Sequence, residues 1–170
     1  VLKSFLSQSD VQFVMIADVQ KTRREVIRVM VNRQYNNQDC AETRDMFDVL
    51  GRKDIDAVVI ATDIGHEHVA RARPFVEAGL PVFIDKPLTD NAPDLKIFQD
   101  WVAAGKPIMS SSSMRYTKEF LPYRLSTREL GDLRFVSITT PKSWETYGIH
   151  ALEAIYPILG PGFISARNTG

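Results

Sequence analysis

Residues 56–62 read Asp-Ala-Val-Val-Ile-Ala-Thr, and residues 81–88 read Pro-Val-Phe-Ile-Asp-Lys-Pro-Leu. Both runs are apolar and rich in Val and Ile, a pattern typical of strands that a parallel sheet buries on both faces. Residues 66–78 between them have apolar side chains at helical spacing, and Gly79 stands where a left-handed cap ends a helix. The stretch therefore predicts a β-α-β unit. Both strands end in polar residues, and ligands bind at the carboxyl ends of strands in open α/β sheets, so chemistry is expected there.

Composition and charge exclude several classes of protein. The 170 residues suffice for one domain and the beginning of a second. With 21 basic and 21 acidic residues the formal net charge is zero, which gives no support for a nucleic-acid or membrane-surface partner. Cys40 is the only cysteine, so there is no intrachain disulfide framework, and a reducing compartment, by default the cytoplasm, is expected. No apolar run approaches the ~20 residues of a membrane span, and the first residues lack the charged-then-apolar pattern of a leader, so neither feature is expected.

The chain before the β-α-β unit also alternates strand and helix. Residues 12–18 have the pattern of another buried strand, and residues 21–31 have that of an amphipathic helix. Residues 32–40 are polar and turn-rich, and residues 43–50 predict a second short helix with Thr43 near its capping position. This order of elements indicates an α/β fold with a doubly wound parallel sheet.

The sequence pattern changes near Leu130. We expect these later elements: a helix over residues 89–104 capped by Asn91, a strand over 107–110, a helix over 117–130 interrupted by Pro122, a β-rich alternation over 133–140 and a helix over 150–159. Because such an alternation is typical of an α+β sheet, residues 1–130 are expected to form the α/β domain and residues 131–170 to begin a second, α+β substrate domain.

Several short motifs occur in an order that points to a family. Residues 61–68 read Ala-Thr-Asp-Ile-Gly-His-Glu-His, residues 77–79 Glu-Ala-Gly, residues 85–87 Asp-Lys-Pro, residues 115–116 Arg-Tyr and residues 148–150 Gly-Ile-His. They resemble motifs of the Gfo/Idh/MocA family of nicotinamide-dependent oxidoreductases, namely Ala-Thr-Pro followed by His, Glu-Ala-Gly, Glu-Lys-Pro, Arg-aromatic and Gly-x-His. The resemblance covers nearly the whole chain and makes residues 1–130 a Rossmann-like dinucleotide-binding domain.

The resemblance also implies a reaction. It is reversible hydride transfer between a nicotinamide cofactor and a hydroxyl carbon of a small-molecule sugar, inositol or related polyol. NAD is the expected cofactor, with NADP less favoured, and a homo-oligomer is expected. No metal site, nucleic-acid partner or membrane partner is expected.

The chain departs from the family in three places. The turn Gly-x-Gly-x-x-Gly, which holds the cofactor pyrophosphate, is absent. In the family's strand order the strand before that turn lies between the strands ending at Asp18 and Thr62, and its loss leaves unpaired backbone groups. We therefore expect native residues before Val1, rather than a different fold or a partner strand. Thr146 replaces an Asp that often lies four residues before the second-domain His, and the chain stops at Gly170, before further strands of the family's second domain.

The cofactor-binding candidates lie at or just after strand ends: Asp18, Thr62, His68, Asp85, Lys86, Pro87 and Arg115. A carboxylate at Asp18 accepts hydrogen bonds from the adenosine ribose and repels a 2′-phosphate, which favours NAD over NADP; the alternative is a turn residue. Thr62 and His68 flank the nicotinamide side, or else His66 and His68 are solvated residues at a helix start. Arg115 and Tyr116 orient the substrate, or Tyr116 packs between domains.

The catalytic candidates are Lys86 and His150. A cation at Lys86 stabilises the alkoxide that develops during hydride transfer; the alternative is a surface lysine paired with Asp85. Pro87 restricts the peptide that holds Lys86, and the cis form is open to it. His150 is the proton relay, because the unperturbed pKa of histidine lies closest to neutrality, or it is a capping or core residue. In the absence of the expected Asp, Glu145 is a substitute candidate for orienting the imidazole.

Two other hypotheses stand beside an oxidoreductase. A non-catalytic protein of the same fold would sense a dinucleotide or a sugar through protein contacts, and Thr146 is its best support. An inert fragment would retain only packing. Turnover with a panel of polyols separates the enzyme from the sensor, since both bind NAD.

Overall fold

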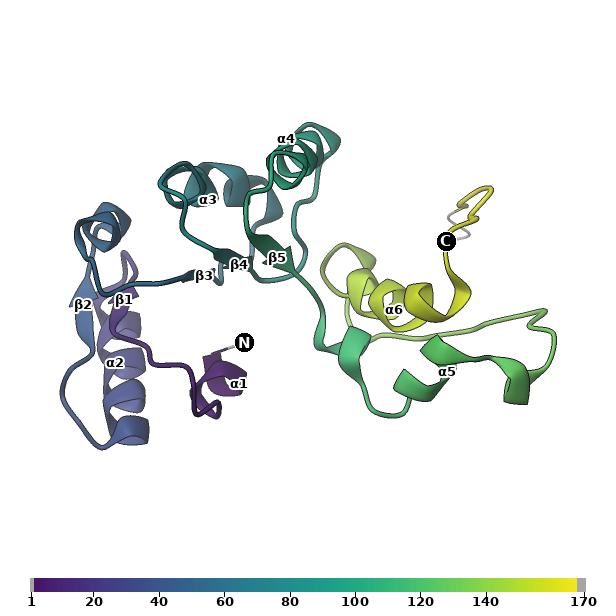
Figure 1. Ribbon diagram of the computed structural model, residues 1–170, viewed down its shortest axis with the longest axis horizontal. Coiled ribbons are helices and arrows are strands. Elements are labelled where there is room, and N and C mark those ends of the chain that lie inside the picture. The colour runs from purple at the N-terminus through teal and green to yellow at the C-terminus, as the bar shows by residue number, and fades with distance from the viewer. Residues whose placement is uncertain (1, 168–170) are drawn as a thin grey trace.

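The computed structural model describes residues 2–167, in which short parallel strands alternate with helices (Figure 1). The elements, with η for 3-10 helices, are α1 (Leu2–Leu6), β1 (Met15–Ala17), α2 (Lys21–Tyr35), β2 (Ala41–Thr43), η1 (Met46–Gly51), β3 (Val58–Ile60), η2 (Gly65–Glu67), α3 (His68–Glu77), β4 (Val82–Ile84), α4 (Ala92–Ala103), β5 (Ile108–Ser110), η3 (Ser113–Tyr116), α5 (Leu121–Leu125), η4 (Arg128–Leu130) and α6 (Trp144–Leu159).

The predicted β-α-β unit is confirmed. β3 pairs in parallel with β4, with Val58 opposite Val82, and α3 connects the two strands. Gly79 follows α3 in the left-handed region, with φ of 82°, where any residue with a side chain is strained. β4 pairs in parallel with β5, so the strand expected over residues 107–110 joins the same sheet.

The parallel sheet is interrupted between β1 and β3. Among residues 2–167, β1 pairs with β2 to form one sheet, and β3, β4 and β5 form a second. No strand pairing joins the two sheets in the described part of the chain. One edge of β1 and one edge of β3 therefore have no hydrogen-bonded strand beside them. The interruption coincides with the place that the resemblance gives to the strand before the glycine-rich turn. The strands and their parallel pairing confirm the α/β class.

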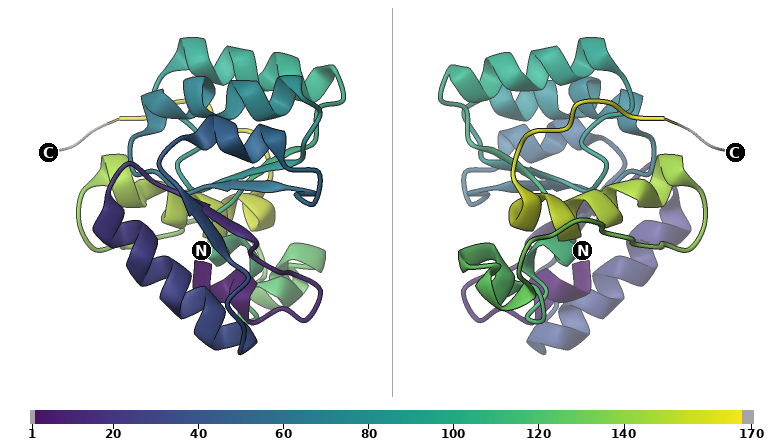
Figure 2. Two further views of the ribbon diagram at one scale, coloured as in Figure 1. Left: turned by 90° about the vertical axis from the view of Figure 1, so that its left-hand side faces the viewer. Right: turned by 90° about the vertical axis from the view of Figure 1, so that its right-hand side faces the viewer.

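Helices cover the strands from two sides. α3 and α4 lie on one side, and α1 and α2 lie on the other (Figures 1 and 2). The larger core lies around α3 and the three-stranded sheet, and its buried residues are Val49, Ile60, Val69, Ala72, Phe75, Val76, Val82, Ile84 and Phe98. A smaller core joins α1, α2 and the start of β2, and its buried residues are Leu6, Val31 and Cys40. The two cores follow the division of the sheet.

The connection from α2 to β3 differs from the prediction. β2 occupies residues 41–43, which follow the turn expected over residues 32–40 and overlap the start of the helix expected over residues 43–50, and Thr43 ends this strand instead of capping a helix. The helix that follows is the 3-10 helix η1, capped by Asp45, whose Oδ1 accepts the Phe47 N–H at 2.9 Å. The sequence Ala-Glu-Thr has no strand pattern of its own, so pairing with β1 makes it a strand.

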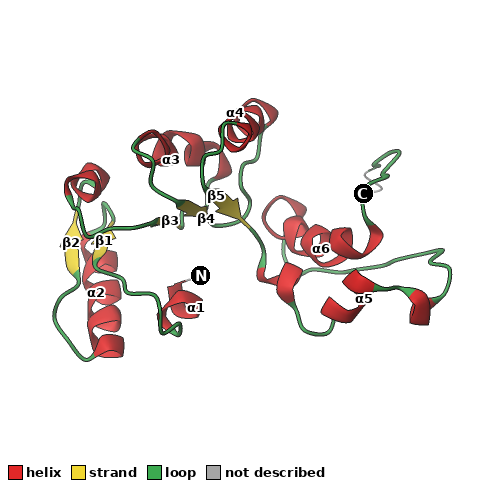
Figure 3. Ribbon diagram, viewed as in Figure 1, coloured by secondary structure: helices red, strands yellow, loops and turns green. Residues whose placement is uncertain are grey.

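The second part of the chain also corrects the prediction. Residues 131–143 form a long loop, without a strand (Figure 3). The alternation over residues 133–140 is therefore not a strand here, because no other segment within residues 2–167 pairs with its backbone. The helix expected over residues 117–130 is split into α5 and η4, and the last helix begins at Trp144 rather than at His150.

α6 brings the second part of the chain back to the sheet. It packs against η3, the turn that follows β5, and so lies beside the carboxyl end of that strand. The domain boundary near Leu130 stays a prediction. None of the helices in the described part of the chain has the length and apolar character needed to cross a membrane.

Candidate active site

Lys86 lies in the loop that joins β4 to α4. The Asp85 carboxylate accepts the Lys86 backbone N–H at 2.8 Å, and the peptide bond from Lys86 to Pro87 is cis. The Lys86 ammonium does not bind Asp85. It lies over the aromatic ring of Tyr147, with Nζ 5.4 Å from the ring centroid, a contact in which the π-face of the ring attracts the cation.

Tyr147 connects Lys86 to His150. Its ring centroid is 5.1 Å from that of the His150 imidazole, one turn further along α6. The lysine of the β4 loop and the histidine of α6 therefore converge on one aromatic side chain, although they lie far apart in the sequence. This convergence is the central feature of the site.

The surroundings of His150 favour its neutral form. Burial lowers the pKa of the imidazole, and the nearby Lys86 ammonium lowers this pKa further, while Asp85 acts weakly in the opposite direction. The imidazole Nδ1 lies 2.6 Å from the Oγ of Ser112, a fully buried residue at the end of β5. A neutral imidazole has one ring nitrogen without a hydrogen, and this nitrogen can accept a proton from a substrate hydroxyl.

The substitute proposed for the missing carboxylate does not reach His150. The Thr146 hydroxyl forms a hydrogen bond with the Ser143 hydroxyl at the start of α6, with 3.1 Å between the two side-chain oxygens. Glu145 is exposed in the first turn of the same helix, where hydrogen bonds to its own backbone and to Ser143 lower its pKa. Within residues 2–167, Ser112 is the side chain that bonds the His150 ring.

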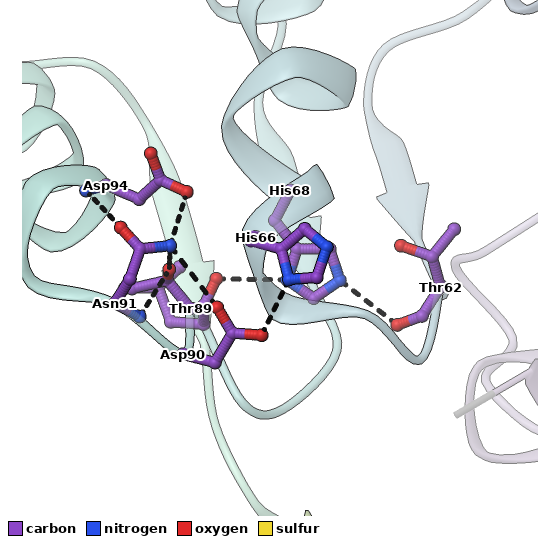
Figure 4. A network of polar contacts seen from close by, with 8 residues as sticks. Thr62, His66, His68, Thr89, Asp90, Asn91 and Asp94 are labelled. Atoms are coloured by element: carbon purple, nitrogen blue, oxygen red, sulfur yellow. Dashed lines mark hydrogen bonds and ion pairs between the residues drawn. The ribbon is translucent and has the colours of Figure 1, made fainter.

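His68 holds two loops of the site together. Its imidazole is fully buried, with Nε2 3.0 Å from the carbonyl oxygen of Thr62 and Nδ1 3.0 Å from that of Leu88 (Figure 4). His68 thus ties the end of β3 to the loop that carries Lys86, and it is not a solvated residue. His66, the alternative at the same helix start, is exposed and pairs with Asp90 at 3.1 Å.

The strand-end residues Thr62 and Asp18 differ in how their side chains are used. Thr62 Oγ1 is buried and has no hydrogen-bond partner in the described part of the chain. Asp18 belongs to the two-stranded sheet, where its Oδ1 accepts the Gln20 N–H at 2.7 Å. Arg24 donates to the Asp18 backbone carbonyl at 2.6 Å. Asp18 is thus a turn residue with a second carboxylate oxygen, Oδ2, left over for a ligand.

Arg115 and Tyr116 are occupied by neighbours on the protein. The Arg115 guanidinium forms an ion pair with Glu153 of α6, and this hydrogen bond raises the pKa of Arg115. The Arg124 guanidinium lies 5.7 Å from the ring centroid of Tyr116. Both contacts join the segment after β5 to the second part of the chain, and neither places these side chains beside Lys86.

Three residues near the site were not singled out by the sequence prediction: Ser112, Tyr147 and Lys142. The Lys142 Nζ donates to the Tyr147 hydroxyl at 3.0 Å and lies 4.7 Å from its ring centroid, and this hydrogen bond lowers the pKa of Tyr147. The run of serines over residues 110–113 at a strand end and the Tyr three residues before His150 were the available signals.

A cavity of ≈ 470 Å³ adjoins the site on the side of α4. Lys86, Ser112 and Glu153 contribute polar groups to its wall, and α4 contributes mainly apolar side chains, among them Phe98 and Val102. Gln99, Ser110 and Ser111 also line it, so the wall has hydrogen-bonding groups mainly on the side of the β5 end and apolar groups mainly on the side of α4.

Comparison with known proteins gives a consistent result. A model of an oxidoreductase family with an NAD-binding Rossmann fold, Gfo/Idh/MocA, matches residues 2–111. The inositol 2-dehydrogenase of Rhodococcus erythropolis (strain PR4) is 38% identical over 93 residues, which cover 51% of this chain and 26% of that enzyme. The chain thus matches about a quarter of the length of this curated relative.

Solved structures share the fold. A candidate myo-inositol dehydrogenase from Sinorhizobium meliloti 1021 superposes with a TM-score of 0.73 at 21% identity, covering 94% of this chain and 51% of that one. GenD2 from gentamicin A biosynthesis, in complex with NAD, superposes with a TM-score of 0.72 at 16% identity, covering 93% of this chain and 49% of that one.

Proposed function

The chain belongs to the Gfo/Idh/MocA oxidoreductase family, and we propose that it is part of a nicotinamide-dependent oxidoreductase that acts on a hydroxyl carbon of a polyol or sugar. An inositol is the first candidate substrate, because the curated relatives are inositol 2-dehydrogenases. The observation that carries the proposal is the convergence of Lys86 and His150 on Tyr147.

The residues present fit a nicotinamide dinucleotide at two points. The buried Thr62 Oγ1 has no hydrogen-bond partner among the described residues, and buried polar groups are rarely left unbonded. Asp18 has Oδ2 available for a ribose hydroxyl, and its charge favours NAD over NADP. We therefore assign Thr62 to the nicotinamide side and Asp18 to the adenosine side. Residues 1–170 hold no glycine-rich turn for the pyrophosphate.

The chemistry divides between two side chains. Oxidation of a polyol removes a hydride from the carbon and a proton from its hydroxyl, and a bound nicotinamide supplies the hydride acceptor. Lys86, which pairs with no carboxylate within residues 2–167, stabilises the negative charge that develops on the substrate oxygen. His150 accepts the proton at Nε2, the ring nitrogen that Ser112 does not contact, and returns it in the reverse reaction.

The remaining predictions about the whole protein stay proposals. We retain residues 1–130 as the dinucleotide-binding domain and residues 131–170 as the beginning of the substrate domain. His68, Asp85 and Pro87 serve the cofactor side by shaping the loops that carry Thr62 and Lys86. A homo-oligomer is expected, as is the cytoplasm, in keeping with a single cysteine, Cys40, that is buried and free.

The test is turnover with NAD⁺ and a panel of inositols, sugars and linear polyols, after calorimetry has established cofactor binding. Lys86→Met is compared with Lys96→Met, whose lysine pairs with Asp100 on the exposed side of α4. We expect Lys86→Met to lose about 10²–10³ in kcat, and Lys96→Met to keep full activity.

Two outcomes would contradict the proposal. Equal turnover by both lysine variants would remove Lys86 from the reaction. Binding of NADH without turnover of any panel member would favour a non-catalytic sensor of the same fold, for which Thr146 in place of an orienting carboxylate is the specific support.

A further inference from the structure

The Ser112 side chain lies between the turn after β5 and α6, and it has a hydrogen-bond contact with each. It is 1% exposed. Its Oγ accepts the Met114 backbone N–H at 3.1 Å, which fixes the hydroxyl oxygen relative to η3. The same oxygen lies 2.6 Å from His150 Nδ1, the only link that the described residues offer to this ring nitrogen. The contact thus crosses from the sheet to the helix that carries the proposed base.

We propose that Ser112 is the positioning residue of His150: its Oγ accepts the Nδ1–H of the neutral imidazole and so keeps Nε2 free to take the substrate proton. The proposal rests on the proposed function, in which His150 exchanges that proton. It assigns to a serine in the turn after β5 the role that Thr146 and Glu145 do not fill on α6 itself.

The hydrogen-bonding capacity of a serine hydroxyl allows this arrangement. The oxygen has two lone pairs and one hydrogen. One lone pair takes the Met114 N–H and the other takes Nδ1–H, so the oxygen holds the ring from a fixed point. The hydroxyl hydrogen is left to turn toward the cavity, whose wall Ser112 helps to form. Which ring nitrogen of a histidine carries the proton is set by the partner of the other nitrogen.

The charged groups around His150 do not compete for Nδ1. Lys86 and Asp85 approach from the β4 loop and act on the imidazole through space. Tyr147 packs its ring against the imidazole from α6. The carboxylate of Glu153, also on α6, is bound by Arg115. Among the described residues, Ser112 is therefore the only hydrogen-bond partner of His150 Nδ1.

The first test is the tautomer of His150, read from ring-nitrogen chemical shifts in a long-range ¹H–¹⁵N correlation spectrum of the chain above the His150 pKa. With three histidines in the sequence, assignment by single His→Gln variants is direct. We expect the proton on Nδ1 and a bare Nε2. A proton on Nε2 would overturn the proposal, and this readout needs no turnover, so it stays separate from the test of the proposed function.

The second test uses Ser112→Ala, with Ser126→Ala as a matched control. Ser126 is exposed, and its Oγ also accepts a backbone N–H two residues on, that of Arg128, at 3.2 Å, but it contacts no histidine. In Ser112→Ala we expect the imidazole to lose the Nδ1–H tautomer and kcat to fall about ten- to hundredfold with KM nearly unchanged. Ser112→Thr, which keeps the hydroxyl, should restore both.

The controls define what would contradict this second test. Ser126→Ala is expected to match the unaltered protein. If Ser112→Ala kept the Nδ1–H tautomer, or if Ser112→Thr failed to restore kcat although its tautomer was restored, Ser112 would be a packing residue. Should Ser112→Ala fail to fold, the tautomer of the unaltered chain decides the question alone.

Discussion

The two sheets of the molecule differ in how firmly they are supported. The three-stranded sheet of β3, β4 and β5 lies on a core of nine buried residues, whereas the two-stranded sheet of β1 and β2 shares a core of three among residues 2–167. Burial of apolar surface is the main source of stability. The three-stranded sheet is therefore the firmer support for whatever its loops carry.

The difference matters because the proposed catalytic residues and the proposed adenosine-ribose ligand lie beside different sheets. Lys86, Thr62 and Ser112 follow strands of the larger sheet, and His150 reaches them from α6. Asp18, the proposed adenosine-ribose ligand, follows β1 on the smaller sheet. The proposed catalytic residues thus lie beside the better packed sheet, and the residue proposed to select the cofactor lies beside the other sheet.

The largest effect is expected from breaking the larger core. Phe98, on α4, is 1% exposed and packs edge-on against Trp101. Phe98→Ala leaves a cavity and should cost about 3–5 kcal/mol in the free energy of unfolding, measured by urea denaturation. The matched control is Phe135→Ala in the long loop, where the ring is 84% exposed; a change of less than about 0.5 kcal/mol is expected. Equal costs would refute the assigned packing.

A smaller loss of stability is expected when the link between the β3 and β4 loops is removed. His68→Leu deletes the imidazole that lies between the Thr62 and Leu88 carbonyls and leaves a buried carbonyl acceptor without a donor. The expected cost is about 1–3 kcal/mol. His66→Leu, at an exposed side chain, should cost less than about 0.5 kcal/mol. A reversed order would mean that His66, rather than His68, joins these loops.

The smallest effect concerns the smaller sheet and is specific to the cofactor. Asp18→Asn keeps the oxygen that accepts the Gln20 N–H but loses the charge. Calorimetry should show the preference for NADH over NADPH falling about tenfold, since a charged hydrogen bond is lost and the repulsion of a 2′-phosphate disappears. Asp45→Asn alters a similar capping Asp without changing the preference. An unchanged preference in Asp18→Asn would leave Asp18 as a turn residue only.

Residues whose own pattern determines their structure were predicted from the sequence. The Val- and Ile-rich runs predicted β3 and β4, Gly79 predicted the end of α3, and Asn91 caps α4 by accepting the Asp94 N–H at 2.9 Å, as expected. These features depend on local sequence and burial alone. For the same reason the strand ends that carry Lys86 and Asp18 were placed correctly.

Features that depend on a distant neighbour were not predictable in this way. The segment Ala41–Thr43 becomes a strand through pairing with β1. The alternating segment after Leu130 is not a strand, because no described segment pairs with its backbone. The contact of Ser112 with His150 joins residues 38 apart in the sequence. No local pattern distinguishes that serine from the three beside it.

The most direct test of the proposed site is the pKa of His150, followed by NMR titration in the unaltered chain and in Lys86→Met. We expect a pKa below the usual value of about 6.5 for histidine, and a rise of this pKa in Lys86→Met, because removing a nearby positive charge makes the protonated imidazole less costly. Lys96→Met should leave the titration unchanged. A His150 pKa at its usual value that does not respond to Lys86→Met would show that the two side chains do not meet, and would contradict the proposed site.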